Sequence, residues 1–189
     1  MKFYESGDNR KPVIFLFPGT CCLYSSFDHV LDGLHSYFYT VTVSYDGFDP
    51  NEKTEFYSME DECEKIEQEI RKKYGGRIYL VAKIQSSMVV PFMYKMVHTG
   101  TLPKFMQKKL DKTDGGKKEL YNGFLNMFGI GKGGSPWITK QSIYNQFYSD
   151  LVTKVQHGID VPGTTIHVFY ATKMGEKYEK RYCTYFKNP

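Results

Sequence analysis

Apolar and polar residues follow one another in blocks in the first quarter of the chain, in an order typical of a strand, a helix and a second strand. Residues 13–17 are a continuous apolar, β-prone run, which predicts a strand covered on both faces of a sheet. Residues 18–20 end this run, and we expect Ser25 or Ser26 to cap the helix that follows. The inward positions of this helix, at helical spacing, are Phe27, Val30, Leu31, Leu34 and Phe38. A second apolar run at residues 40–45 predicts a strand parallel to the first.

The next segments continue this alternation of strands and helices. Ser58, with Asp61 three residues later, is close to a capping box and predicts the start of a helix. The apolar positions of that helix are Met59, Cys63, Ile66 and Ile70. Further apolar runs predict a third core strand at residues 77–82 and a last one at residues 165–171, and a helix follows at residues 176–186.

The remaining segments add an edge strand and a long helical region. Residues 2–5 predict a short strand, which the turn residues 6–9 join to the strand at residues 13–17 in an edge hairpin. Residues 104–155 are helical and polar. They include a glycine-rich stretch at residues 129–134, which lacks the spacing of a phosphate-binding loop and does not follow a strand. We therefore interpret it as a flexible loop between helices.

Composition narrows the class of protein. The chain has 189 residues, which is enough for one domain with a sizeable core. Its formal charge is 25 − 21 = +4, and this charge is too small and too scattered along the chain to indicate a nucleic-acid partner. The chain has four cysteines, Cys21, Cys22, Cys63 and Cys183. None of them is part of a C-x-x-C pair, so they indicate neither a zinc site nor a disulfide framework. We expect Cys63 to be a small core residue. No secretory leader or membrane span is evident, so we expect a soluble, cytoplasmic protein without metal or cofactor.

The turn after the first core strand is the main candidate for chemistry. In the stretch from Lys11 to Asp46 an apolar strand, the tight turn Pro18-Gly19-Thr20-Cys21-Cys22 and a helix follow in the order that builds an anion site from backbone N–H groups. Fixed N–H donors of this kind stabilise the negative charge that develops on a carbonyl oxygen during acyl transfer. The alternative is an ordinary strand-to-helix turn, for which proline and glycine are common.

The stretch from Lys11 to Asp46, KPVIFLFPGTCCLYSSFDHVLDGLHSYFYTVTVSYD, resembles the first half of an α/β-hydrolase. In that family a loop beginning His-Gly or Pro-Gly supplies one N–H of the oxyanion hole, which implies backbone roles for Gly19, Thr20 and Cys21. The resemblance also implies an α/β fold, a three-layer α/β/α sandwich with a mostly parallel sheet. It further implies a core of residues 1–86 and 156–189 with a helical cap at residues 87–155.

The chain departs from the family where its most specific motif should lie. The strand at residues 77–82 runs into Lys83-Ile84-Gln85-Ser86, which places Ile84 where G-x-S-x-G carries the nucleophilic serine, and no G-x-S-x-G occurs elsewhere. No histidine follows His167, so the place of the family's catalytic base is absent as well. We therefore expect an incomplete fold and a catalytically impaired relative of serine hydrolases that cleave carboxylic esters or similar acyl bonds.

Other side chains near these segments could take part in chemistry. Cys21 could act as a nucleophile, because a turn that leads into a helix lowers the pKa of a thiol. A role as a buried residue that contributes only its backbone N–H is favoured, because the spacing places no base beside the thiol. Ser86 and Ser87 fit helix capping better than catalysis. Asp46 ends a strand, where ligands gather in open α/β sheets, although local turn formation with Gly47 competes with that role.

Two further functional hypotheses remain. The first is a non-catalytic module that binds a small apolar or ester ligand between the carboxyl edge of the sheet and an aromatic cap. Its substrate-binding candidates are Tyr24, Tyr45, Asp46 and Trp137. The second is a truncated or internally deleted chain without a function of its own, in which a missing central strand exposes backbone and apolar surface and allows self-association.

Overall fold

The computed structural model describes residues 1–75, 78–82, 137–154, 156–160, 162–163, 165 and 176–187, with a few isolated residues between 94 and 119. The chain forms two compact units, Met1–Val152 and Thr153–Pro189. The stretch around Ile84, which corresponds to the nucleophile elbow of α/β-hydrolases, lies outside the described residues. The division into a core at residues 1–86 and 156–189 and a cap at residues 87–155 therefore stays a prediction.

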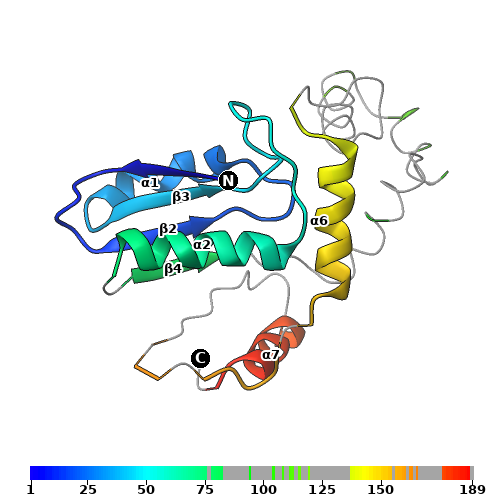
Figure 1. Cartoon of the computed structure of the whole chain (residues 1–189). Coiled ribbons are helices and arrows are strands. Elements are labelled where there is room, and N and C mark those ends of the chain that lie inside the picture. The colour runs from blue at the N-terminus through cyan, green and yellow to red at the C-terminus, as the bar shows by residue number, and fades with distance from the viewer. Residues whose placement is uncertain are drawn as a thin grey trace. The chain divides into compact units, whose positions relative to one another are not determined.

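The first unit contains a mixed, mostly parallel sheet (Figure 1). Its strands in the described part of the chain are β1 (Lys2–Ser6), β2 (Val13–Phe17), β3 (Tyr39–Ser44) and β4 (Ile78–Ala82). They lie in the order β1-β3-β2-β4, with β2 parallel to both β3 and β4 and with β1 antiparallel at the edge. The continuous apolar run at residues 13–17 therefore predicted the central strand β2 correctly, because a strand covered on both faces needs apolar residues at every position.

The pairing of β1 differs from the expected hairpin. β1 lies at the sheet edge, as the sequence predicted, but it pairs with β3, with Lys2 opposite Ser44 and Ser6 opposite Thr40. The hairpin prediction was wrong because both edges of β2 are taken by β3 and β4. The N-terminal strand pairs instead with the outer edge of β3.

Helices cover both faces of the sheet, which confirms the three-layer α/β/α arrangement. Side chains of a strand alternate between faces, so Ile14 and Leu16 point one way and Phe15 the other. Ile14 and Leu16 pack with Phe27, which precedes α1 (Asp28–His35). On the opposite face, Phe15 belongs to the larger core cluster, against which residues of α2 (Met59–Lys73) pack.

The start of α1 differs from the expected cap. A short 3₁₀ turn, η1 (Tyr24–Phe27), contains both Ser25 and Ser26, and no side chain caps α1. Phe27 is buried as predicted, but Val30 is 37% exposed. The prediction assumed one uninterrupted helix. The 3₁₀ turn, with three residues per turn instead of 3.6, rotates the apolar face of the helix.

The start of α2 confirms the predicted cap: the Ser58 Oγ accepts a hydrogen bond of 3.2 Å from the Asp61 N–H. Met59, Ile66 and Ile70 pack against the core. Cys63 is exposed, so its placement in the core was wrong. The buried residue of this turn is its neighbour Glu62.

Ser58→Ala is expected to lower the free energy of unfolding by about 1 kcal/mol, because the Asp61 N–H loses its acceptor at the helix start. Urea denaturation followed by circular dichroism measures this loss. Ser25→Ala is the matched control, since that serine caps no helix, and should change stability by less than about 0.5 kcal/mol. Equal losses in the two variants would contradict the capping role.

The core of the first unit combines the sheet with a distant helix, α6 (Lys140–Val152). Ile143 and Phe147 of α6 are buried in the same cluster as Phe15, Val41 and Val43. The sequence predicted a polar helix here, yet three of its polar residues are buried too: Ser142, Gln146 and Ser149. α6 is therefore part of the packed core.

The second unit contains α7 (Glu176–Tyr185), which confirms the predicted C-terminal helix. Ile159 and Phe186 form a parallel bridge within this unit. The strand expected at residues 165–171 lies outside the described residues apart from Thr165. In the described part of the chain, no helix has the length and hydrophobicity needed to cross a membrane.

Candidate functional site

The turn after β2 has an unusual backbone conformation. Cys21 has φ +56°, and among the described residues it is the only non-glycine with positive φ. The Cys22 N–H donates to the Gly19 carbonyl at 2.9 Å, which closes the turn. Because a left-handed conformation costs an L-residue roughly 1–2 kcal/mol, the surrounding structure must hold Cys21 in place. Cys21 is 1% exposed, and burial raises the pKa of its thiol well above the usual value, so this cysteine is a poor nucleophile.

Two side chains of α6 bond to this turn. The Cys21 N–H donates to the Gln146 Oε1 at 2.7 Å, and this contact is buried. The Thr20 Oγ1 donates to the Asp150 Oδ2, also at 2.7 Å. A backbone donor named from the sequence as an oxyanion-hole candidate is thus bonded to a side-chain carbonyl oxygen, which is chemically similar to the oxygen of a substrate amide or ester.

The same face of α6 bonds to the loop that follows β3. The Ser142 Oγ accepts from the Phe56 N–H at 3.1 Å, and the Asn145 Nδ2 donates to the Phe56 carbonyl at 2.8 Å. The Ser149 Oγ accepts from the Met59 N–H at 3.2 Å. The five α6 residues that bond to these segments lie three or four positions apart, on one face of the helix: Ser142, Asn145, Gln146, Ser149 and Asp150. We call them the polar face of α6.

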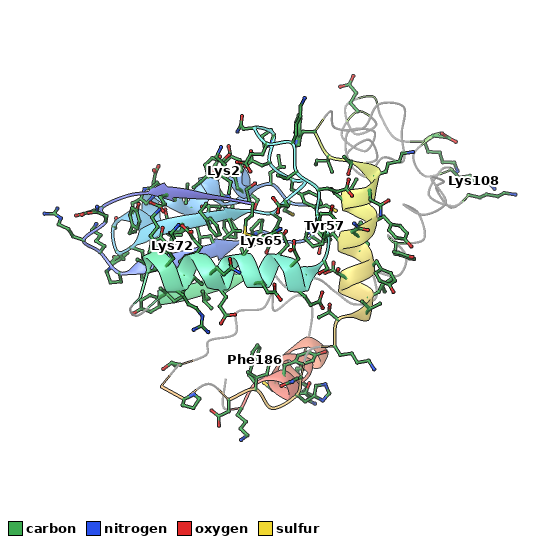
Figure 2. All side chains as sticks on the ribbon, viewed as in Figure 1. Lys2, Tyr57, Lys65, Lys72, Lys108 and Phe186 are labelled. Carbon is green, nitrogen blue, oxygen red and sulfur yellow. The ribbon has the colours of Figure 1, made fainter. Side chains whose placement is uncertain are left out.

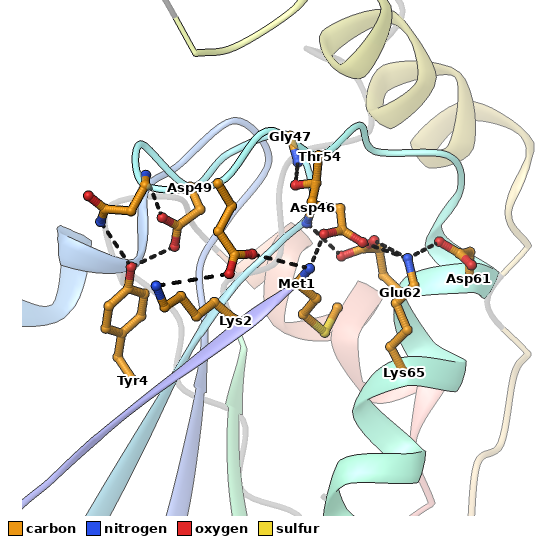
Figure 3. Close-up of polar contacts among 12 residues, drawn as sticks. Met1, Lys2, Tyr4, Asp46, Gly47, Asp49, Thr54, Asp61, Glu62 and Lys65 are labelled. Carbon is orange, nitrogen blue, oxygen red and sulfur yellow. Dashed lines mark hydrogen bonds and ion pairs between the residues drawn. The ribbon is translucent and has the colours of Figure 1, made fainter.

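A charged cluster lies at the carboxyl end of β3 (Figure 3). Asp46 forms ion pairs with the Met1 ammonium and with the Lys65 Nζ, the latter at 2.6 Å. Figure 2 shows Lys65 on α2, and its ammonium also contacts Asp61 and lies 3.5 Å from the Glu62 Oε1. Asp46 is thus held by charges of its own chain, besides ending a strand as the sequence indicated.

Glu62 is the buried member of this cluster. Its side chain is 0% exposed, and its Oε2 accepts from the Asp46 N–H at 3.1 Å. Burial raises the pKa of Glu62 to about 7, although the charges of Lys65 and the Met1 ammonium lower it. Sequence reasoning missed this residue. Its position, three residues after Met59 and four before Ile66, is the signal that could have identified it.

The cluster has the donor set of a hard-cation site. Carboxylate oxygens of Asp46, Asp61 and Glu62 lie within 4.8 Å of one another, and such oxygens are the ligands that Ca²⁺ and Mg²⁺ prefer. The Lys65 ammonium contacts all three carboxylates. Since Lys65 already supplies a positive charge at this position, the geometry gives a metal ion no separate role.

The aromatic candidates for ligand binding lie in different places. Tyr45 is buried in the core cluster that contains Cys21, and Trp137 packs against that cluster. The Trp137 indole N–H is buried without a hydrogen-bond acceptor among the described residues. Tyr24 instead stacks on Tyr4 with ring centroids 3.9 Å apart. The structure thus brings Cys21, Tyr45 and Trp137 to one cluster, while Tyr24 packs against the edge strand.

A hydroxyl–imidazole contact lies at the amino end of β3. The His35 Nε2 is 2.9 Å from the Ser6 Oγ and 3.1 Å from the Thr40 Oγ1. The two hydroxyls are 2.7 Å apart. Because Thr40 is fully buried, we interpret the group as a polar contact that joins β1, β3 and the end of α1. Sequence reasoning did not find it, since the three residues come together only through the β1–β3 pairing.

No protein-family model matches the sequence, and no curated protein matches it. Solved structures do resemble the chain. One from Desulfitobacterium hafniense, described as an alpha/beta hydrolase family protein, has a TM-score of 0.47 at 11% identity and covers 78% of this chain and 71% of its own. The structure of 1H-3-hydroxy-4-oxoquinoline 2,4-dioxygenase has a TM-score of 0.45 at 15% identity, and the match covers 76% of this chain and 64% of the dioxygenase chain. A hydrolase from Pseudomonas aeruginosa PA01 has a TM-score of 0.44 at 12% identity, and the match covers 81% of this chain and 69% of the hydrolase chain.

These likenesses concern the overall fold, and all three TM-scores lie below 0.5. The α/β assignment therefore depends on the sheet itself, with its strand order β1-β3-β2-β4 and its helices on both faces.

Proposed function

We propose that this chain is an α/β-hydrolase-family protein that keeps the charge-stabilising turn of an acyl-transfer enzyme and lacks its nucleophile and base. The turn is the segment Pro18–Cys22, with the N–H of Cys21 as its principal donor and Gly19 and Thr20 as the other backbone candidates. The family's relatives hydrolyse carboxylic esters or similar acyl bonds. This chain has no G-x-S-x-G and no histidine after His167, so we expect it to be catalytically impaired.

The observation that carries this proposal is the hydrogen bond from the buried Cys21 N–H to the Gln146 carbonyl oxygen, at 2.7 Å. Effective oxyanion-hole donors lie about 2.7–3.1 Å from the oxygen that they stabilise. The donor is fixed by a left-handed backbone, which supports a retained binding geometry at the end of β2.

A second candidate function is binding without turnover. The hydrogen bond from the Cys21 N–H to the Gln146 side chain favours this second function, because in this bond the turn accommodates a neutral carbonyl group. In this proposal a small ester or other apolar ligand lies beside the core cluster of Tyr45 and Trp137, under a helical cap formed by residues 87–155 that includes α6. The four free cysteines support a reducing compartment such as the cytoplasm.

The test combines an activated ester with a serine-directed probe. Turnover of 4-nitrophenyl acetate is expected to exceed the rate in buffer by no more than about 10³–10⁴-fold, which is the residual catalysis that binding and N–H donors supply without a triad. A fluorophosphonate probe is expected to label no serine, as measured by peptide mass spectrometry. Labelling of any serine would overturn the proposed loss of catalysis. Ser6→Ala is the control variant for this labelling, because the Ser6 Oγ lies 2.9 Å from the Nε2 of His35 and an imidazole can activate a neighbouring hydroxyl.

A further inference from the structure

We propose that the Cys21 turn is a binding site for the carbonyl oxygen of a neutral ligand, closed in this structure by Gln146 of the same chain. A ligand would enter by replacing the side-chain amide of Gln146. This inference rests on the proposed function for the role of the turn, and it adds the class of ligand and the residue that controls access.

Burial is the first argument. Cys21 and Gln146 are each 1% exposed, so the N–H of Cys21 is shielded from water. A buried N–H without an acceptor costs free energy, and the turn therefore needs an acceptor whether or not a ligand is present. Gln146 provides this acceptor from a residue 125 positions away in the sequence. A ligand oxygen at the same distance would satisfy the N–H equally well.

The contacts of α6 are the second argument. α6 meets the turn and the loop after β3 largely through the hydrogen bonds of its polar face. Each such bond contributes little net stability, because a ligand group can replace the partner. Ile143 and Phe147 of α6 are buried in the core cluster and keep the helix in place. The exchange with a ligand therefore involves the Gln146 side chain, while α6 stays packed in the core.

Charge indicates the class of ligand. The Asp150 carboxylate bonds to the Thr20 hydroxyl, next to Cys21 in the chain. Burial raises the pKa of Asp150, and its charge is among the causes that raise the pKa of the Cys21 thiol. A second carboxylate would be repelled there, whereas a neutral amide or ester would not. The site should therefore prefer a neutral carbonyl compound over a carboxylate of the same size.

Gln146→Ala with acetamide tests the inference. The substitution removes Cγ and the amide group, which together have the composition of acetamide. Acetamide is therefore expected to raise the melting temperature of Q146A saturably, by about 3 °C at roughly ten times its dissociation constant. Acetate should give a clearly smaller shift. Gln141→Ala is the matched control, since it removes the same side chain from an exposed position of the same helix, and acetamide should not stabilise it.

Absence of saturable stabilisation in folded Q146A, or an equal shift in Q141A, would overturn the inference. If Q146A does not fold by itself, recovery of its far-UV circular dichroism signal by acetamide is the readout, and no recovery overturns the inference. Gln146→Met keeps the length of the side chain without the oxygen, so a melting temperature equal to that of the unmodified protein would also count against it. Ester turnover and serine labelling test the proposed function separately, because neither depends on acetamide binding.

Discussion

Gly47→Ala is expected to destabilise the first unit by about 3 kcal/mol and to separate α6 from the sheet. Gly47 has φ +77°, a conformation that alanine rarely adopts. A Cβ atom at this position would lie 2.3 Å from the Ser142 Oγ and 2.9 Å from the Phe56 backbone nitrogen. Ser142 accepts the Phe56 N–H, so the new methyl group would occupy the space of the contact that holds α6 to this loop.

Fluorescence of Trp137, the single tryptophan of the chain, measures this change because it lies three residues before α6 and packs against the core cluster. Urea denaturation gives the loss of stability. Gly158→Ala is the matched control: it also has positive φ, at +68°, but nothing lies within 4 Å of its new Cβ. The control should lose only about 1 kcal/mol and keep its tryptophan spectrum. Equal effects would show that backbone conformation, not the contact with α6, explains the loss.

The parts of the fold that could be predicted are those set by local pattern. The runs that became β2 and β3 were found nearly to the residue, because β2 is apolar throughout and β3 is rich in β-branched residues. The Ser58 cap was predicted for a similar reason, since the hydroxyl and the Asp61 N–H that it accepts are three residues apart. Local spacing contained all the information in these cases.

The parts that could not be predicted depend on partners far apart in the sequence. The pairing of β1 with β3 depends on which edges remain open after β2 is paired on both sides. The polar face of α6 has the spacing of a solvent-exposed face, and only the loops that it meets show that it is buried. For the same reason the Cys21 turn could be named from the sequence, but Gln146 could not.

Glu62 makes the stability of the first unit depend on pH. Its side chain is fully buried, and burial raises its pKa from the ordinary value of 4.5 to about 7. The charged groups around it are the Lys65 and Met1 ammonium groups, which lower this pKa, Asp61, which raises it, and Asp46, whose carboxylate oxygen lies within 4.8 Å. The folded protein therefore holds a proton that the unfolded chain releases between pH 4.5 and 7. The stability contributed by this protonation is fully present below pH 4.5 and is lost as the pH rises through 7.

Between pH 5 and pH 8 this group should reduce the free energy of unfolding by about 3 kcal/mol. Glu62→Gln keeps an oxygen that can accept from the Asp46 N–H and does not ionise, so this part of the pH dependence should disappear. Urea denaturation at several pH values measures the difference. Glu64→Gln is the control, because it removes an exposed carboxylate from the same helix and should leave the slope unchanged. If E62Q and the unmodified protein lost stability in parallel above pH 6, the Glu62 carboxyl would already be ionised in the folded state. The Lys65 and Met1 charges would then outweigh the cost of burying it.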